Sequence, residues 1–235
     1  MNNSLATTAR LLGAGLRALL VLSVLTGVLY PLAVTGVAQS LFRGAANGSE
    51  VRADGRTVGS SLIGQSYDLP PRKGENAPRP DLRWFQGRPA NGLGVNSVNT
   101  RYHLLLSGAT NLAADSGAVR GRCPAVPEEG TLCAQVLTAR AAVARDNSVP
   151  GHPVAPADVP PDAVTSSGSG LDPDISPRYA LLQVRRVAAY SDLPVSRVRQ
   201  LVDAHTEKRT LGFIGEPRVN VLELNVALRQ AAARG

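Results

Sequence analysis

The feature that most constrains this chain of 235 residues is a run without charged side chains near its N-terminus. No Asp, Glu, Lys or Arg occurs between Arg17 and Arg43, and the run reads ALLVLSVLTGVLYPLAVTGVAQSLF. As an α-helix it would extend about 37 Å, enough to cross a hydrocarbon core of about 30 Å with some tilt. We therefore expect a short tail over residues 1–17, a transmembrane helix over 18–42 and one soluble domain over 43–235.

A cleaved secretory signal is the alternative interpretation of the same run. Arg10 and Arg17 form a basic start, and Gly36-Val37-Ala38 resembles a cleavage site of small residues. The apolar region of a signal usually spans about 7 to 15 residues, whereas this run is longer and is followed at once by Arg43. The length favours a retained membrane anchor.

Small and polar residues recur at intervals of four along the predicted span. Small residues let helices approach closely, and polar side chains inside a bilayer favour a protein neighbour. The pattern predicts a helix contact, although ordinary membrane-helix composition would also produce it. Pro31 in addition predicts a kink. The candidate partner contacts on this face are Ser23, Gly27, Pro31 and Thr35.

Charge and cysteine content limit the partners of the chain. The 25 basic and 18 acidic residues are interspersed, and only 4% of residues are aromatic, so no basic, aromatic-rich surface for nucleic acid is indicated. The charges on the two flanks of the span are nearly balanced and do not fix its orientation. Cys123 and Cys133 are close enough in sequence to close a disulfide, which would fit an exported domain, or they remain free thiols.

The remaining sequence favours an α+β domain with a small sheet and several helices. Asp54-Gly55 lies between two extended segments and predicts a hairpin, whereas residues 68–83 are rich in Pro and charge and predict a loop. Residues 159–164 predict a short extended piece. Apolar residues at helical spacing begin at Leu132, Ala180 and Val198; Ser176-Pro177 is typical of a helix start, and Asn220 with Glu223 is typical of a capped terminal helix.

Several catalytic signatures are missing from the chain. Its lysines are Lys73 and Lys208, and neither stands in a phosphate-binding G-x-x-x-x-G-K-[ST] loop or in the Asp-Lys-Thr-Gly sequence of a P-type pump. No G-x-S-x-G nucleophile motif occurs, and the three His residues are widely spaced. We therefore expect no catalytic residue, no metal site and no cofactor of the chain's own.

The polar loop at residues 165–174 (TSSGSGLDPD) is a candidate contact surface. Its glycines allow close approach of a partner, and its exposed amides are suited to an anion. A simple turn that leads to the Ser176 cap explains the same residues. The candidate contacts in this loop are Gly168, Ser169, Gly170 and Asp172.

Six blocks, taken in order along the chain, resemble the signature blocks of the C chain of the potassium-transporting ATPase, the KdpC family. Asn220, in the last and longest block, completes the candidate partner contacts. The blocks are residues 59–65 (GSSLIGQ), 85–89 (FQGRP), 107–112 (SGATNL), 167–177 (SGSGLDPDISP), 183–187 (QVRRV) and 210–225 (TLGFIGEPRVNVLELN).

The resemblance implies a non-catalytic accessory subunit of the high-affinity ATP-driven potassium pump of the bacterial plasma membrane. Its implied partners are a channel-like A chain, an ATP-hydrolysing B chain and a small F chain, together with membrane lipid. The family's C chain is described in two ways. One account makes it a catalytic chaperone that raises the ATP affinity of the B chain, with ATP bound jointly by both chains; the other makes it a single-span subunit with an exported domain. Because ATP is cytoplasmic, an exported domain cannot touch it, and we favour the exported topology, with the N-terminus in the cytoplasm.

The sequence departs from the family pattern at Gln86, Ala109 and Asp174, where the family usually has His, Gly and His. The two missing His residues exclude an essential proton carrier at those positions. A membrane-anchored or secreted enzyme with an unrecognised site is the alternative function.

Overall fold

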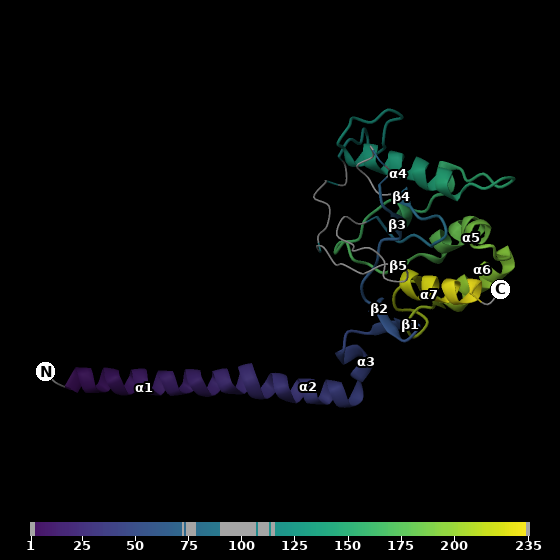
Figure 1. The fold of residues 1–235 in the computed structure, drawn as a ribbon. Helices are drawn as coiled ribbons and strands as arrows, with labels where there is room; N and C mark the ends of the chain where they lie inside the picture. The colour runs from purple at the N-terminus through teal and green to yellow at the C-terminus, as the bar shows by residue number, and fades with distance from the viewer. Residues whose placement is uncertain are drawn as a thin grey trace. The chain divides into compact units, whose positions relative to one another are not determined.

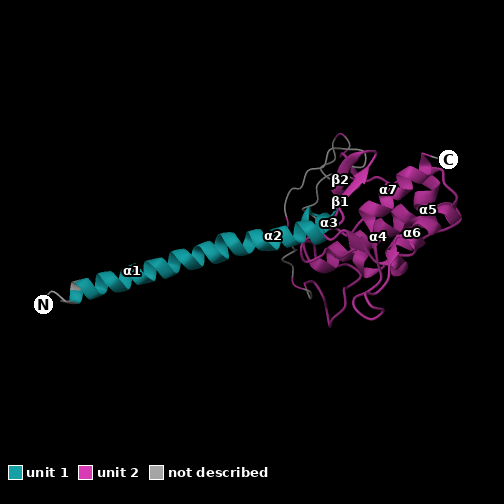
Figure 2. Cartoon of the chain, turned by 90° about the horizontal axis from the view of Figure 1, so that it is seen from below, with its two compact units in different colours: residues 1–49 teal, residues 50–235 magenta. Residues whose placement is uncertain are grey.

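A long helix forms most of the first of two compact units, residues 1–49 (Figure 2). Helix α1 (Asn3–Val24) continues through the π-helical turn η1 (Leu25–Leu29) into α2 (Tyr30–Leu41), and the short α3 (Arg43–Ala46) follows. The helix is long and apolar enough over Ala6–Leu41 to cross a membrane. The expected apolar N-terminal helix is therefore present, and most of the residues expected as a tail belong to the same helix.

The π-helical turn accommodates Pro31. Proline has no N–H, and in a regular α-helix its ring would crowd the carbonyl of Gly27. In η1 the Tyr30 N–H instead bonds to Leu25 O, which widens the turn directly before Pro31. The kink predicted at Pro31 is therefore not formed: Figure 1 shows α1 and α2 continuing in nearly the same direction, with the π-helical turn between them.

The computed structural model describes residues 3–71, 73, 79–89, 107, 113 and 116–233. The second unit, residues 50–235, begins with the predicted hairpin of β1 (Glu50–Ala53) and β2 (Arg56–Ser60). Asp54 and Gly55 form its turn with φ of 50° and 77°, the left-handed conformation that two-residue hairpin turns require. Five of the six family blocks lie largely within the described residues; of the block at 107–112 only Ser107 does.

Two further small sheets complete the β structure of the described residues. Strands β3 (Asp68–Leu69) and β4 (Arg79–Pro80) pair antiparallel, so part of the segment expected to be a loop is extended. The third sheet has the order β5–β7–β6, all antiparallel, from β5 (Asp174–Ile175), β7 (Arg218–Asn220) and β6 (Thr206–Glu207).

Four helices build the core of the second unit. They are α4 (Leu132–Asn147), α5 (Pro177–Ser191), α6 (Val195–Ala204) and α7 (Val221–Ala232), and α5 contacts both α4 and α6 (Figure 1). Ser176 and Asn220 cap α5 and α7 as predicted, each accepting a hydrogen bond from the residue three positions on. The prediction of an extended piece at residues 159–164 is wrong, because 3-10 turns η2 (Pro156–Asp158) and η3 (Pro161–Ala163) occupy this Pro-rich region.

One hydrophobic cluster joins these elements, and the α+β class is confirmed. Its fully buried side chains come from the hairpin, from the 85–89 block and from α5, α6, β7 and α7; among them are Val58, Phe85, Val187, Val198, Val219, Leu222 and Leu224.

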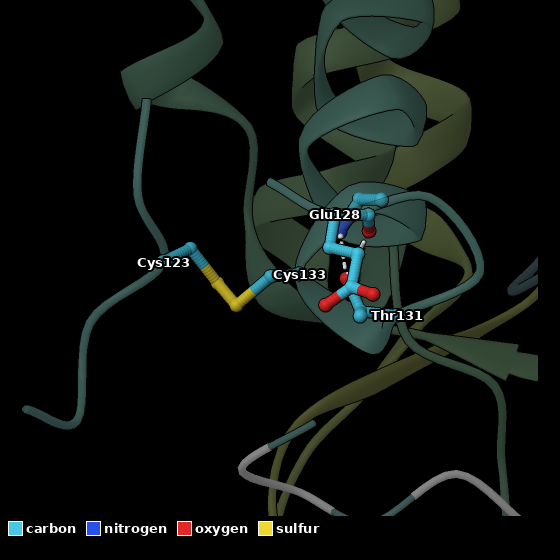
Figure 3. Close-up of a disulfide and its surroundings, with 5 residues drawn as sticks. Cys123, Glu128, Thr131 and Cys133 are labelled. Atoms are coloured by element: carbon cyan, nitrogen blue, oxygen red, sulfur yellow. Dashed lines mark hydrogen bonds between the residues drawn. A yellow bond between two sulfur atoms is a disulfide. The ribbon is translucent and has the colours of Figure 1, made fainter. Parts of the chain in front are cut away.

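A disulfide between Cys123 and Cys133 ties a surface loop to the start of α4 (Figure 3). Thr131 caps this helix by accepting a hydrogen bond from Ala134 N, and its hydroxyl donates to Glu128 O over 2.6 Å. Of the two states considered from the sequence, the structure therefore has the disulfide, and the cysteine pair fixes the N-terminal end of α4.

Candidate functional site

The FQGRP block at residues 85–89 is held by side-chain amides from two helices. Asn225 of α7 accepts from Phe85 N and donates to Phe85 O, each over 2.9 Å. Gln183 of α5 accepts from Gln86 N over 2.7 Å and donates to Gln86 O over 3.1 Å. Each amide therefore bonds the backbone as a neighbouring strand would, and the segment is fixed inside the domain.

Arg186 extends this network as a buried cation. Its guanidinium donates to Leu82 O over 2.5 Å, Trp84 O over 2.9 Å, Asn147 Oδ1 over 2.8 Å and Gln183 Oε1 over 2.6 Å. Burial lowers the pKa of Arg186 to about 10, so it stays charged at neutral pH. Its role is to satisfy carbonyl oxygens at the centre of the domain, because an unpaired buried acceptor would be costly.

Arg88 joins the FQGRP block to the polar loop at residues 165–174. Its guanidinium pairs with Asp172 over 3.0 Å and donates to the carbonyl oxygens of Thr165 and Ser166, each over 3.3 Å. The side chains of Arg88 and Asp172 are both partly exposed. Two blocks that are distant in sequence thus form one structural unit near the domain surface.

The polar loop uses its own amides internally. The N–H groups of Gly170, Leu171 and Asp172 bond to Ser167 O, Ser169 Oγ and Ser167 Oγ. Those amides are therefore engaged, which favours the turn interpretation over an anion site. Gly168 and Ser169 are exposed, whereas Gly170 is buried and Asp172 is partly buried.

The remaining predicted contact in the domain, Asn220, stabilises the fold from a buried position. Its amide accepts from Glu223 N over 3.2 Å and donates to Ser61 O over 2.8 Å, and the residue is buried. Asn220 therefore caps α7 and joins it to the turn after β2.

The four predicted contacts of the apolar helix lie in the first unit and are exposed there. They are Ser23, Gly27, Pro31 and Thr35. A Cβ added at Gly27 would meet no atom within 4 Å. These residues are four positions apart, which is more than the roughly 3.6 residues of one α-helical turn, so in a regular helix their row would drift around the axis. The π-helical turn contains more residues per turn, so the row drifts less between Ser23 and Pro31.

A cavity of about 350 Å³ lies beside the buried network. Its lining combines polar and apolar groups and includes Tyr67, Gln86, Arg88, Asn147, Tyr179 and Arg186. Within the described part of the chain, no group of three or more His, Cys, Asp and Glu side chains could hold a metal ion. Burial raises the pKa of the Tyr67 and Tyr179 hydroxyls, so neither is disposed to act as a base at neutral pH.

Comparison with known proteins assigns the family. A family model described as "KdpC: K+-transporting ATPase, c chain" matches residues 12–230. The chain belongs to the KdpC family. It is 68% identical over 235 residues to the "Potassium-transporting ATPase KdpC subunit" of Streptomyces coelicolor, covering 100% of this chain and 99% of that protein. It is also 64% identical to the protein of the same name from Streptomyces avermitilis, covering 99% of each chain, and 42% identical to that of Gemmatimonas aurantiaca, covering 90% of this chain and 88% of the relative.

Sequence reasoning did not predict the amide and guanidinium network of this KdpC domain. Gln183 and Arg186 are polar, and the apolar stripe that predicts α5 consists of Ala180, Val184, Val187 and Ala188. The available signal was the position of Gln183, which lies on the same helical face as that stripe, one turn before Val187; Arg186 lies one turn after Gln183, on the flank of the stripe, where the sequence gives no such signal. Their buried state shows that this face binds backbone as well as apolar groups.

Proposed function

We propose that this chain is the non-catalytic accessory subunit of an ATP-driven potassium pump. It is held in the plasma membrane by its apolar helix, with the N-terminus in the cytoplasm, and acts through contacts with the channel-like A chain, the ATP-hydrolysing B chain and the small F chain. The observation that carries this proposal is the family match over residues 12–230. The name of the Streptomyces coelicolor relative, a subunit of a potassium-transporting ATPase, supports the same role.

The disulfide supports placing the domain on the outer face of the membrane. Disulfides persist in oxidising compartments and are rare in the cytosol. The Cys123–Cys133 bond therefore fits an exported domain. Alkylation of intact cells and of membranes without reduction should modify neither cysteine, and reduction should expose both; two freely alkylated thiols would contradict this topology.

A role in assembly follows from the way the family blocks are built. The FQGRP block is fixed from both sides by Gln183 and Asn225, and Arg88 ties it to the polar loop. In this arrangement of the FQGRP block and the polar loop, Gly168 and Ser169 are exposed and form the proposed contact. The residues that make these bonds do not include a nucleophile paired with a base. Because an exported domain cannot reach cytoplasmic ATP, an effect on the ATP affinity of the B chain would pass through the assembled complex.

Co-purification tests this function. A tagged chain, expressed with its pump subunits in cells grown at limiting potassium, should recover the A and B chains. Deleting the chain should abolish growth at micromolar potassium, and labelled phosphate should be trapped on the B chain only. Recovery of the tagged chain without either large subunit, or phosphate on this chain, would refute the proposal.

A further inference from the structure

Apolar side chains gather at the tip between β6 and β7. Leu211, Phe213 and Ile214 are 79%, 71% and 51% exposed. They lie on a short connection, residues 210–215, which we call the apolar tip. Single exposed apolar residues are common on soluble domains, but three within four positions form a local patch that usually marks a contact.

The apolar tip is held in one conformation by its own backbone. Thr210 N donates to Ile214 O and Ile214 N donates to Thr210 O, each over 2.9 Å, and Gly212 N donates to Arg209 O over 3.0 Å. Leu211 adopts a left-handed φ of 55°, which is unfavourable for a side chain of this kind. A backbone closed in this way presents its side chains without further ordering, which reduces the entropy lost when a partner binds.

Lys208 and Arg209, which directly precede the apolar tip in the sequence, are two cations beside it. Arg218, on β7, is already paired with Asp174 over 3.1 Å and with Glu207 over 2.7 Å. In contrast, the ion pairs found among the described residues do not include Lys208 or Arg209. The tip therefore offers an apolar centre next to two cations, a combination that an apolar pocket with an acidic rim would match.

We propose that the apolar tip docks into such a pocket on a membrane-embedded subunit of the pump, with Phe213 as the central anchor. This inference rests on the proposed function. Only residues 43–49 separate the predicted span from β1, and seven residues reach at most roughly 25 Å. The tether keeps the domain near the bilayer, where a membrane-embedded partner is present at high effective concentration.

The bilayer itself is the competing occupant, and two observations favour a protein. The chain already has a long apolar helix as its anchor, so three more apolar side chains would add little to membrane retention. The closed backbone of the tip also suits insertion into a shaped pocket, whereas a fluid lipid interface requires no fixed geometry.

The first test compares co-purification of full-length variants. The double change Leu211→Ser with Phe213→Ser should lower the recovery of pump subunits per tagged chain at least threefold. The control Val126→Ser, at a residue 89% exposed in the loop that the Cys123–Cys133 disulfide closes, should leave recovery unchanged. If the unmodified chain recovers no pump subunit, the proposed function fails; if it does and the tip variant recovers as much, only the docking inference fails.

The second test separates a protein partner from lipid. The native cysteines are joined to each other, so Phe213→Cys introduces a single reactive thiol for an environment-sensitive dye. In liposomes, the dye emission should shift to shorter wavelength when the A, B and F chains are present and not with lipid alone. Dye at Val126→Cys should not shift in either sample. A shift with lipid alone would assign the tip to the bilayer, and no shift in the assembled pump would refute docking.

Discussion

Asn225 and Phe85 are 140 residues apart, yet they close a ring of two hydrogen bonds at the centre of the domain. Both residues are fully buried, so neither backbone group of Phe85 has access to water. The terminal helix α7 thereby positions the FQGRP block directly, and Gln183 repeats the arrangement at the next residue from α5. The block is a fixed part of the core rather than a free surface loop.

Replacing Asn225 by Leu should destabilise the domain strongly. The substitution keeps a similar volume but leaves the N–H and C=O of Phe85 buried without partners, at about 1 to 3 kcal/mol each. We expect a loss of about 2 to 6 kcal/mol in the free energy of unfolding. Urea unfolding of the full chain in detergent, followed by the fluorescence of Trp84, the only tryptophan, measures it. Gln135→Leu, at an exposed position of α4, is the control and should change stability by less than about 0.5 kcal/mol.

Replacing Arg88 by Lys should loosen the polar loop without unfolding the domain. An ammonium group cannot reproduce the planar set of donors that Arg88 directs to Asp172, Thr165 O and Ser166 O. The partly exposed ion pair with Asp172 contributes little through its charge, so the lost bonds to the two carbonyl oxygens dominate, at about 1 kcal/mol. The amides of Gly170 and Leu171 should then exchange with deuterium roughly fivefold faster. Equal exchange rates in Arg88→Lys and in the control Arg199→Lys would show that the bonds from Arg88 do not hold the polar loop in place.

Asp81 gives the domain a defined response to acid. Burial alone would raise the pKa of its carboxyl, but the hydrogen bonds and the charge of Arg83 outweigh burial, so the pKa lies below its ordinary value. A carboxyl with a lowered pKa in the folded state adds stability at pH values above its unfolded pKa, near 3.9, and this stability is lost as the pH falls through the folded pKa.

The stability difference between the unmodified chain and Asp81→Asn should therefore be largest at neutral pH and shrink below about pH 4. Urea unfolding at pH 7, 5, 4 and 3 measures it, with the exposed Glu129→Gln as control. A difference that is constant over this range, or that grows in acid, would contradict the assignment to the Asp81 carboxylate.

Local signals predicted the parts of the fold that local chemistry decides. Asp54-Gly55 specifies its turn by backbone conformation, and Ser176 and Asn220 specify helix starts by accepting an amide hydrogen bond. The cysteine pair left two states open, because spacing limits the reach of a disulfide without fixing whether it forms. These features depend on a few neighbouring residues, which is why the sequence reveals them.

The features that the sequence did not predict depend on distant residues. Nothing near Gln183 or Asn225 indicates that each will bond the backbone of the FQGRP block, so a polar side chain on a helix is expected at the surface. Pro-rich residues 159–164 suit an extended chain as well as 3-10 turns, and the packing of Ala163 and Val164 in the core decides between them. The candidate contacts Gly168 and Ser169 could be placed on the exposed part of a loop, but the partner they would touch is encoded in other chains.

The apolar helix provides a test of how the subunit is held in its complex. Gly27 lies in the π-helical turn η1, where an added Cβ would meet no atom of the chain, so a partner helix has room to approach on this face. In a bilayer, helix association gains little from hydrophobic burial, and close packing must supply most of the free energy.

We therefore predict that Gly27→Leu lowers co-purification with the pump subunits more than Leu25→Ala does, although the second change removes more apolar surface. The recovery of the A and B chains per tagged subunit in mild detergent measures both variants, and both should remain in membranes after a carbonate wash. If the two variants assemble equally well, or if Leu25→Ala is the more damaging, the face that carries Ser23, Gly27, Pro31 and Thr35 is turned to lipid, and the subunit is held by its soluble domain.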